Sequence, residues 1–226
     1  MLLDNGYLTE VRTGLAGALA AKYAAPERVQ TVGMIGVGSQ ARYQLRALRL
    51  VRDFERVLAW GRRQDAAEAY AREMTGELGI EVVARADAES VVRESQIVAT
   101  TTTARRPVVD EEWVHSGLHI TAVGSDGPDK QELDAAILAR ADHVVCDLIS
   151  QCERLGELHH ALAGGLVTAE PVTELGQHVV AGRSVRTSED ELTVCDLTGV
   201  GVQDAAIAAY AFERAKELKL GAMAGA

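Results

Sequence analysis

Small residues at positions 36, 38 and 41 have a spacing that suits the binding of phosphate groups. The segment GVGSQA (36–41) matches G-x-G-x-x-G/A and joins a predicted strand to a predicted helix. Gly36 permits a tight turn, Gly38 lets a pyrophosphate approach the backbone, and Ala41 lets helix and strand pack closely. A glycine-rich turn without a ligand is the alternative, but the context favours a dinucleotide site at the helix N-terminus. The residues predicted to bind the cofactor here are Gly36, Gly38, Ser39, Gln40 and Ala41.

The end of the next predicted strand, Gly61-Arg62-Arg63, bears on the type of dinucleotide. Proteins that bind NAD place an acidic residue about 20 positions after the glycine loop, where it holds the ribose 2′-hydroxyl. This strand end has no Asp or Glu, whereas Arg62 and Arg63 could hold a 2′-phosphate by charge-assisted hydrogen bonds. The alternative is a pair of solvated arginines at the start of a helix. The sequence favours NADP over NAD as the NAD(P) cofactor.

Threonines close the fourth predicted strand at Thr100, Thr101 and Thr102. The carboxyl ends of strands in a doubly wound sheet face the ligand crevice, so these hydroxyls could contact the cofactor's ribose. The same residues are also typical of a β-strand that runs into a loop. Pattern alone leaves both interpretations open.

Two further loops could face a ligand. The segment GSDGPDK (124–130) places Asp126 after a predicted strand, where it could act as a general base or bind a substrate amine. The sequence Asp-Gly-Pro is also typical of a turn, and the local pattern by itself favours the turn. The segment DLTGVGVQD (196–204) joins an apolar run to a helix through glycines, as a ligand-facing loop or simply as the start of that helix.

The elements that would position these residues alternate along the chain. Short apolar runs separated by helical stretches predict an α/β fold, a Rossmann-type doubly wound parallel sheet covered on both faces. Helices are predicted at 39–51, 65–78 and 131–140. The predicted strands are 32–36, 56–60, 80–84, 96–100, 119–123 and 143–147.

Both ends of the chain are predicted to be helical, at 6–25 and 202–220. Neither helix has a strand partner inside the βαβ region, so both are interpreted as parts of an incomplete second domain. The predicted division is a linking helix (1–25), an NAD(P)-binding Rossmann domain (26–198) and a C-terminal helix that returns to the second domain (199–226).

Composition narrows the class of protein. The net charge of −10 argues against a nucleic-acid partner, and no run of eighteen apolar residues indicates a membrane span. The N-terminus lacks the pattern of a signal peptide, and no C-x-x-C pair occurs, so no metal site or disulfide framework is predicted. Free thiols favour a cytoplasmic location. The three cysteines are Cys146, Cys152 and Cys195.

Four motifs in order resemble the ornithine cyclodeaminase/mu-crystallin family along nearly the whole chain. They are GYLTEVRTG (6–14), IGVGSQAR (35–42), AVGSDGPDKQELD (122–134) and DLTGVGVQDAAIA (196–208). The segment QCERLGELHHAL (151–162) also resembles the branch of the family that is assigned to ectoine utilisation.

The resemblance implies bound NAD(P) and a small amino-acid or cyclic-imine substrate. In cyclodeaminase members a hydride leaves the substrate α-carbon for NAD⁺, ammonia is lost as the side-chain amine closes a ring, and the hydride returns. The alternative within this family is an NADPH-dependent ketimine reductase or amino-acid dehydrogenase. Asp126 matches the catalytic aspartate and Arg12 matches an arginine that binds the substrate carboxylate. The loop matched to the nicotinamide side is Thr198, Gly199, Val200 and Gly201.

The resemblance also implies that family members carry a further N-terminal third with a sheet, substrate-binding residues and much of a dimer interface. The apolar Met1–Leu3 segment resembles the remainder of a strand from that sheet. A homodimer is expected where that part is present. A non-catalytic NAD(P)H-binding protein is a further alternative for the shorter chain.

Overall fold

The centre of the protein is an eight-stranded sheet, which the computed structural model places within its described residues, 5–220. The predicted strand at Met1–Leu3 lies outside these residues. Every pair of neighbouring strands is parallel, and the order is β3-β2-β1-β4-β6-β10-β8-β9. The strands are β1 (Thr31–Ile35), β2 (Arg56–Trp60), β3 (Glu81–Ala84), β4 (Ile97–Thr100), β6 (His119–Ala122), β8 (His143–Cys146), β9 (Thr173–Glu174) and β10 (Thr193–Asp196).

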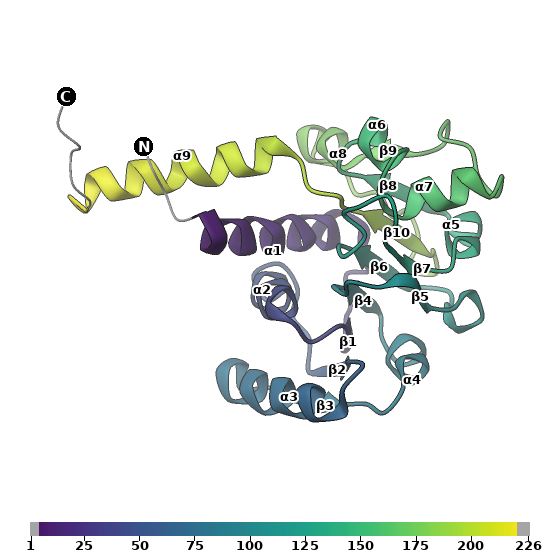
Figure 1. The fold of residues 1–226 in the computed structure, drawn as a ribbon, viewed down its shortest axis with the longest axis horizontal. Helices are drawn as coiled ribbons and strands as arrows, with labels where there is room; N and C mark the ends of the chain where they lie inside the picture. The colour runs from purple at the N-terminus through teal and green to yellow at the C-terminus, as the bar shows by residue number, and fades with distance from the viewer. Residues whose placement is uncertain (1–4, 221–226) are drawn as a thin grey trace.

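Helices cover both faces of this sheet (Figure 1). On one face lie α1, α2 and α3, and on the other lie α4, α5 and α7. The predicted doubly wound α/β class is therefore confirmed. The helices are α1 (Asn5–Ala24), α2 (Ser39–Leu48), α3 (Gln64–Leu78), α4 (Ala88–Arg93), α5 (Ala136–Arg140), α6 (Ile149–Cys152), α7 (Gly156–Ala163), α8 (Leu175–Ala181) and α9 (Gly201–Glu217), with a 3₁₀ turn at Glu111–Trp113.

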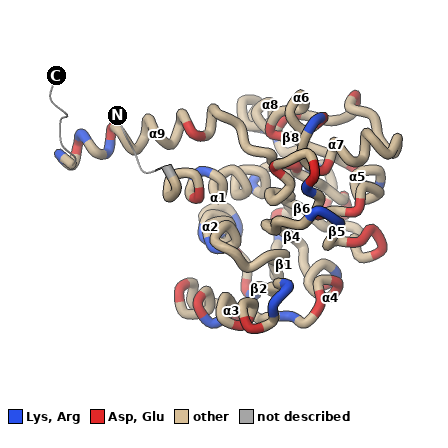
Figure 2. The backbone as a smooth tube through the Cα atoms, in the orientation of Figure 1, with Lys and Arg blue, Asp and Glu red and all other residues tan. Residues whose placement is uncertain are grey.

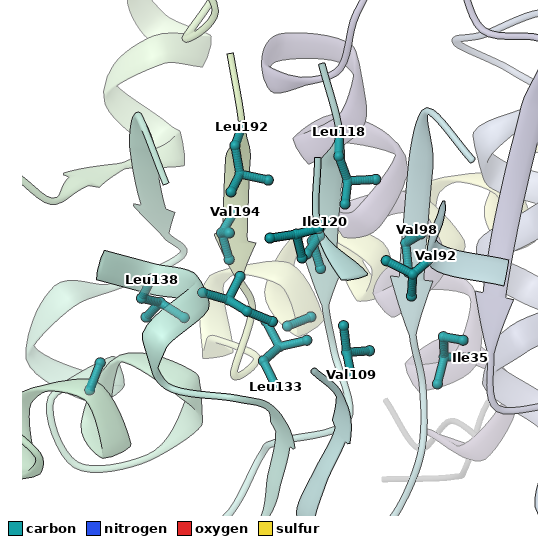
Figure 3. Close-up of a cluster of buried hydrophobic side chains, with 14 of the residues drawn as sticks. Ile35, Val92, Val98, Val109, Leu118, Ile120, Leu133, Leu138, Leu192 and Val194 are labelled. Carbon is teal, nitrogen blue, oxygen red and sulfur yellow. The ribbon is translucent and has the colours of Figure 1, made fainter. Parts of the chain in front are cut away.

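The core explains why the central strands are continuously apolar. All five residues of β1 are buried, because helices pack on both faces of a parallel sheet. On one face, Val92 of α4 and Leu138 of α5 pack with the strand residues Val98, Ile120 and Val194 (Figure 3). On the opposite face, α2 and α3 contribute to a second cluster, and the largest fully buried side chains that these two helices supply are Leu45, Tyr70 and Met74.

The N-terminal helix α1 packs directly on α2. A Cβ atom at Gly14 would lie 2.6 Å from the carbonyl oxygen of Tyr43, so the two backbones approach closely at this glycine. The side-chain amide of Gln44 donates to the Thr13 carbonyl at 2.9 Å. The C-terminal helix α9 runs beside α1 and extends past the sheet (Figure 1), and none of its residues is buried within the described chain. Helices are thus confirmed at both ends, while the division into 1–25, 26–198 and 199–226 stays a prediction.

The helix predicted at 131–140 is wrong in its first part. Residues Gln131–Leu133 form β7, which pairs in parallel with β5 (Arg105–Val109) in a separate two-stranded sheet. The helix begins only at Ala136, whose backbone N–H donates to the Asp134 carboxylate at 2.9 Å. Burial of Glu132 and Leu133 holds this segment extended. Strands β5, β9 and β10 were not predicted.

The distribution of charge on the described chain is mixed. Figure 2 shows lysine and arginine residues interspersed with aspartate and glutamate along the helices. Across residues 5–220, no helix combines the length and apolar character that a membrane span requires.

Candidate cofactor and substrate site

The glycine loop between β1 and α2 is closed on one side and open on the other. Gly36 has a φ of 101°, a left-handed conformation that favours glycine, and its N–H donates to the Trp60 carbonyl at 2.8 Å. A Cβ atom at Gly36 would lie 2.9 Å from the hydroxyl of Thr101, so β4 closes that side. A Cβ atom at Gly38 would meet nothing within 4 Å of it in the described structure. The loop therefore leaves room above Gly38 at the N-terminus of α2.

Two polar atoms beside this loop are buried without a hydrogen-bond partner among the described residues. They are the side-chain oxygen of Gln40, in the first turn of α2, and the hydroxyl of Thr101, just after β4. The other end of the Gln40 amide donates to the Glu10 carboxylate at 2.7 Å, which fixes its orientation. Buried polar groups are nearly always hydrogen-bonded in proteins, so both atoms fit a polar ligand above the loop.

Arg42 supports the glycine loop, and the sequence prediction missed it. Its guanidinium donates to the carbonyls of Val37 and Gly38 at 3.0 and 2.9 Å. The same group forms two hydrogen bonds with the Glu73 carboxylate of α3, and that contact raises the pKa of Arg42. The sequence did contain a signal for this role. Arg42 comes directly after Ala41, one turn into the predicted helix, where its side chain can reach back to the loop.

The end of β2 brings the predicted 2′-phosphate residues to the edge of the loop. A Cβ atom at Gly61 would lie 2.6 Å from a methyl group of Val37, so this strand end abuts the glycine loop. Arg62 and Arg63 follow in exposed positions. Arg63 lies 3.5 Å from the Asp65 carboxylate, and both of these side chains are largely exposed. Solvent screening makes such a pair weak, so Arg63 can exchange Asp65 for another anion.

The three predicted threonines have different environments. The hydroxyl of Thr100 is buried and donates to the Glu132 carboxylate at 2.6 Å, which commits it to a structural contact. The hydroxyl of Thr102 accepts the Ala104 N–H at 3.1 Å. Thr101 alone of the three has the buried hydroxyl without a partner in the described structure.

Asp126 lies on the loop after β6, next to the end of β4 in the sheet order. Its carboxylate pairs with the Lys130 ammonium, and 56% of its side chain is exposed. The loop is also closed by the Ser125 hydroxyl, which donates to the Lys130 carbonyl at 2.6 Å. The segment therefore forms the turn predicted from Asp-Gly-Pro, and it also leaves the Asp126 carboxylate accessible.

Arg12 projects from α1 towards the segment after β10. Its guanidinium lies 3.0 Å from both the Asp204 carboxylate and the side-chain oxygen of Gln203. A Cβ atom at Gly199 would lie 3.1 Å from the same guanidinium. A cavity of about 320 Å³ between α1 and α9 includes Arg12 and is otherwise lined mainly by apolar side chains. The structure thus places Arg12 against the predicted loop 198–201.

That loop is itself held from the end of β8. The Asp147 carboxylate accepts the Thr198 hydroxyl at 3.1 Å and the Gly199 N–H at 2.7 Å. The Gln151 amide donates to the Gly199 carbonyl at 2.6 Å. The sequence prediction missed Asp147 and Gln151, although the end of the strand predicted at 143–147 was a usable signal. The other two residues of the loop, Val200 and Gly201, lead into α9.

Cys146, Cys152 and Asp196 come together behind the loop, although their sequence spacing predicts no site. One ligand-type atom from each lies within 4.8 Å of the others, and all three side chains are buried. The Asp196 carboxylate accepts the Leu158 N–H at 2.9 Å, and burial raises the pKa of Asp196 to about 7. The Cys152 thiol lies 3.5 Å from the Asp147 carboxylate. These contacts join the ends of β8 and β10 to α6 and α7.

The carboxyl ends of β1, β4 and β6 bring the glycine loop, Thr101 and Asp126 to one edge of the sheet. The strand order changes direction between β1 and β4, which is where doubly wound proteins form their ligand crevice. The open face at Gly38 and the buried oxygens beside it fit a dinucleotide. Fold and site together define a protein of the Rossmann-type class.

The chain belongs to the ornithine cyclodeaminase/mu-crystallin family, whose model matches residues 1–219. It is 46% identical over 224 residues to an uncharacterized cyclodeaminase of Sinorhizobium fredii, an alignment that covers 99% of this chain and 68% of the relative. The resemblance inferred from the four motifs is confirmed.

Solved structures of relatives share the fold. An archaeal alanine dehydrogenase dimer with bound NAD superposes with a TM-score of 0.92 and 38% identity, covering 98% of this chain and 68% of that one. The Δ1-pyrroline-2-carboxylate reductase of Thermococcus litoralis, in complex with NADH and L-proline, has a TM-score of 0.93 and 32% identity. That match covers 97% of this chain and 68% of the reductase.

Proposed function

We propose that this chain is an NAD(P)-dependent enzyme that acts on a small amino acid, ornithine or a related diamino acid, as a cyclodeaminase. The observation that carries the proposal is the meeting of the glycine loop, the Asp126 loop and Thr101 at one edge of the sheet. The likeness to a cyclodeaminase and to proteins solved with NAD or NADH supports it. The finer assignment to ectoine catabolism rests only on residues 151–162 and stays a prediction.

The chemistry divides between the cofactor and this chain. When bound, NAD(P) would take a hydride from the substrate α-carbon and later return it to the ring. Arg12 would hold the substrate carboxylate through its planar guanidinium, after exchange of its present partners Asp204 and Gln203. Asp126 would move a proton at the substrate amine as ammonia leaves and the side-chain amine closes the ring.

The cofactor would lie along the residues already described. The N–H groups at the start of α2, around Ser39 and Gln40, would face the pyrophosphate above Gly38. Thr101 would contact the ribose or the nicotinamide amide. Loop 198–201 would cover the nicotinamide side.

A reductase or dehydrogenase is the second candidate, because the solved relatives at 38% and 32% identity are an alanine dehydrogenase and a pyrroline-carboxylate reductase. In that case the chain would reduce a cyclic imine, or would convert a keto acid and ammonia to an amino acid, with net consumption of NAD(P)H. The first candidate predicts ammonia release from ornithine with no net change in cofactor. If the chain binds the cofactor saturably but turns over no amine or imine, the remaining interpretation is a non-catalytic NAD(P)H-binding protein.

The deciding experiment is a titration of the 226-residue chain with NADH and NADPH, followed by nicotinamide fluorescence, and then assays of ammonia and of absorbance at the NAD(P)H band. Tighter binding of NADPH, lost in an Arg62→Ala/Arg63→Ala double variant that keeps its NADH affinity, would assign the two arginines to a 2′-phosphate. Equal affinity for both cofactors would reject the preference for NADP. Failure of the folded chain to bind either cofactor would reject the proposed function.

A further inference from the structure

The Glu132 carboxylate accepts hydrogen bonds from residues at the carboxyl ends of both β4 and β6. One of its carboxylate oxygens accepts the Thr102 N–H at 2.5 Å. The other accepts the Thr100 hydroxyl at 2.6 Å and the Gly124 N–H at 2.7 Å. The side chain is fully buried, so water does not compete for these donors. A single carboxylate therefore binds three donors from two neighbouring strand ends.

Gly124 shows how closely these strand ends approach. A Cβ atom at this position would lie 2.2 Å from the Thr102 carbonyl and 2.5 Å from the Glu132 carboxylate. Any larger residue would push the two segments apart. Thr101 and Thr102 follow β4, and Asp126 lies two residues after Gly124, so this contact sets the spacing between the threonine segment and the Asp126 loop.

Glu132 is in turn fixed by a second buried carboxyl group. The backbone N–H groups of Glu132 and Leu133 donate to the Glu157 carboxylate at 2.8 and 3.1 Å. Glu157 lies in the first turn of α7, where the next N–H, from Leu158, donates to Asp196 at the end of β10. Burial raises the pKa of both Glu132 and Glu157, whereas the hydrogen bonds each accepts favour its ionised form. The contacts run from β4 through β7 and α7 to β10.

The glycine loop touches the Thr101 end of this network at Gly36, and it also has supports of its own. It is held by the hydrogen bond from Gly36 to Trp60 and by Arg42, which lies on α2. Within the described residues, the hydrogen bonds of Glu132 outside its own sheet are with the ends of β4 and β6 and with Glu157 of α7. The two halves of the site thus meet at Thr101, and each half also has a support of its own.

We propose that Glu132 is a positioning residue, which locks the Thr101–Thr102 segment and the Asp126 loop into one rigid edge facing the nicotinamide half of the cofactor. This inference rests on the proposed function for the identity of the ligand. It goes beyond that function by dividing the site into a pyrophosphate half, supported by Arg42, and a nicotinamide half, supported by Glu132.

The test uses the isosteric variant Glu132→Gln in the full chain. A carboxamide has only one acceptor oxygen, so its NH₂ group must face either Thr102 or the pair formed by Thr100 and Gly124. Three quantities are measured: ADP-ribose affinity, NADH affinity with nicotinamide emission, and hydrogen exchange at the Thr102 and Gly124 amides. ADP-ribose lacks only the nicotinamide ring of the cofactor, so a loss of affinity confined to NADH reports the contacts of that ring.

We expect ADP-ribose affinity to stay within about twofold of wild type while NADH affinity falls about fivefold or more, the scale of one lost charged hydrogen bond. Nicotinamide emission should shift towards that of free NADH, and at least one of the two amides should exchange about tenfold faster. The matched control is Ser95→Ala, a buried and nearly isosteric change at the amino ends of the strands, where the Ser95 hydroxyl donates to the Val91 carbonyl at 2.7 Å. It should alter none of the three quantities by more than about twofold.

A folded Glu132→Gln chain with an unchanged ratio of NADH to ADP-ribose affinity and protected amides would overturn the inference. If Glu132→Gln does not fold, Thr100→Val removes one of the donors and must speed exchange at Gly124 or Thr102 for the inference to stand. If the wild-type chain binds neither NADH nor ADP-ribose, the proposed function and the cofactor half of the inference both fail. The exchange measurement still decides whether Glu132 locks the two strand ends.

Discussion

At the scale of single residues, a substitution at Gly38 should change ligand affinity without changing stability. Its φ of −77° is accessible to any residue, and a Cβ atom there would meet nothing within 4 Å in the described chain. We therefore expect Gly38→Ala to leave the melting temperature nearly unchanged, while affinity for ADP-ribose falls about tenfold or more because the methyl group occupies the approach of the pyrophosphate. Calorimetric titration and thermal unfolding check the two halves of this prediction.

The control for Gly38→Ala is Gly176→Ala in α8, where a Cβ atom would also meet nothing within 4 Å in the described structure. This change should leave binding unchanged and should not lower the melting temperature, since alanine is the better helix former. A Gly38→Ala chain that binds ADP-ribose as tightly as wild type would show that no phosphate lies above this glycine.

Asp126 carries the most specific chemical prediction. We expect Asp126→Asn to lower turnover about 100-fold or more, since an amide cannot take up the proton, and to leave NADH affinity nearly unchanged. Lys130→Met is the informative companion, because it removes the ion-pair partner and keeps the carboxylate. Steady-state rates with the substrate identified by the ammonia assay provide the measurement. Unchanged turnover in Asp126→Asn would remove this residue from the mechanism.

Local signals identified the residues of the glycine loop, whereas the residues that support the site depend on distant contacts. Gly36, Gly38 and Ala41 lie within six positions, and their neighbours along the chain define their context. Glu132 binds donors 8 to 32 positions away, and Arg12 reaches partners 191 and 192 positions away. No periodicity encodes such contacts, so the role proposed for Glu132 became visible only in the fold, and Arg12 was singled out only through its match to a family motif.

At the scale of elements, burial decided where prediction succeeded and failed. Strands β1, β4 and β6 were recognisable because both of their faces are covered and their sequences are continuously apolar, whereas the equally buried β10 was not predicted. The segment 131–133 was assigned to a helix, because Gln and Glu read as residues of a solvated helix face. The fold instead buries Glu132 among backbone N–H groups, and that burial keeps the segment extended as β7.

The contact between α1 and α2 gives a prediction at this scale. A methyl group at Gly14 would lie 2.6 Å from a backbone oxygen of α2, which cannot move independently of the helix. We expect Gly14→Ala to lower the free energy of unfolding by about 1–3 kcal/mol through overpacking. Urea unfolding with a fitted slope is the measurement.

Gly76→Ala in α3 is the matched control, since it makes the same change within a helix where a Cβ atom would meet nothing within 4 Å in the described structure. This variant should gain about 0.5–1 kcal/mol from the better helix propensity of alanine. A Gly14→Ala chain as stable as Gly76→Ala would mean that α1 is only loosely docked on α2.

At the scale of the whole molecule, buried carboxyl groups give stability a defined pH dependence. Burial raises the pKa of Asp196 to about 7, so the folded chain retains a proton that the unfolded chain releases near pH 4. The contribution of this proton to stability is complete below about pH 4 and is lost as the pH rises towards 7. We expect wild type to lose stability relative to Asp196→Asn over this window, by at most about 1.4 kcal/mol per pH unit.

Urea unfolding of both chains at several pH values between 4 and 8 measures this difference. Glu81→Gln, a change at an exposed position on β3, should follow wild type at every pH. A difference between wild type and Asp196→Asn that stays constant across the window would show that Asp196 ionises in the folded chain as it does in the unfolded one.

The contact of Arg12 with Asp204 and Gln203 has a consequence for how a carboxylate could be recognised. Any incoming anion must replace an anion that the chain already supplies, so binding at Arg12 is a substitution of one partner for another. Most of the Coulomb energy would then cancel between the two states, and ionic strength would have little influence on affinity. Selection among ligands would fall to the remainder of each molecule, because every carboxylate faces the same internal competitor.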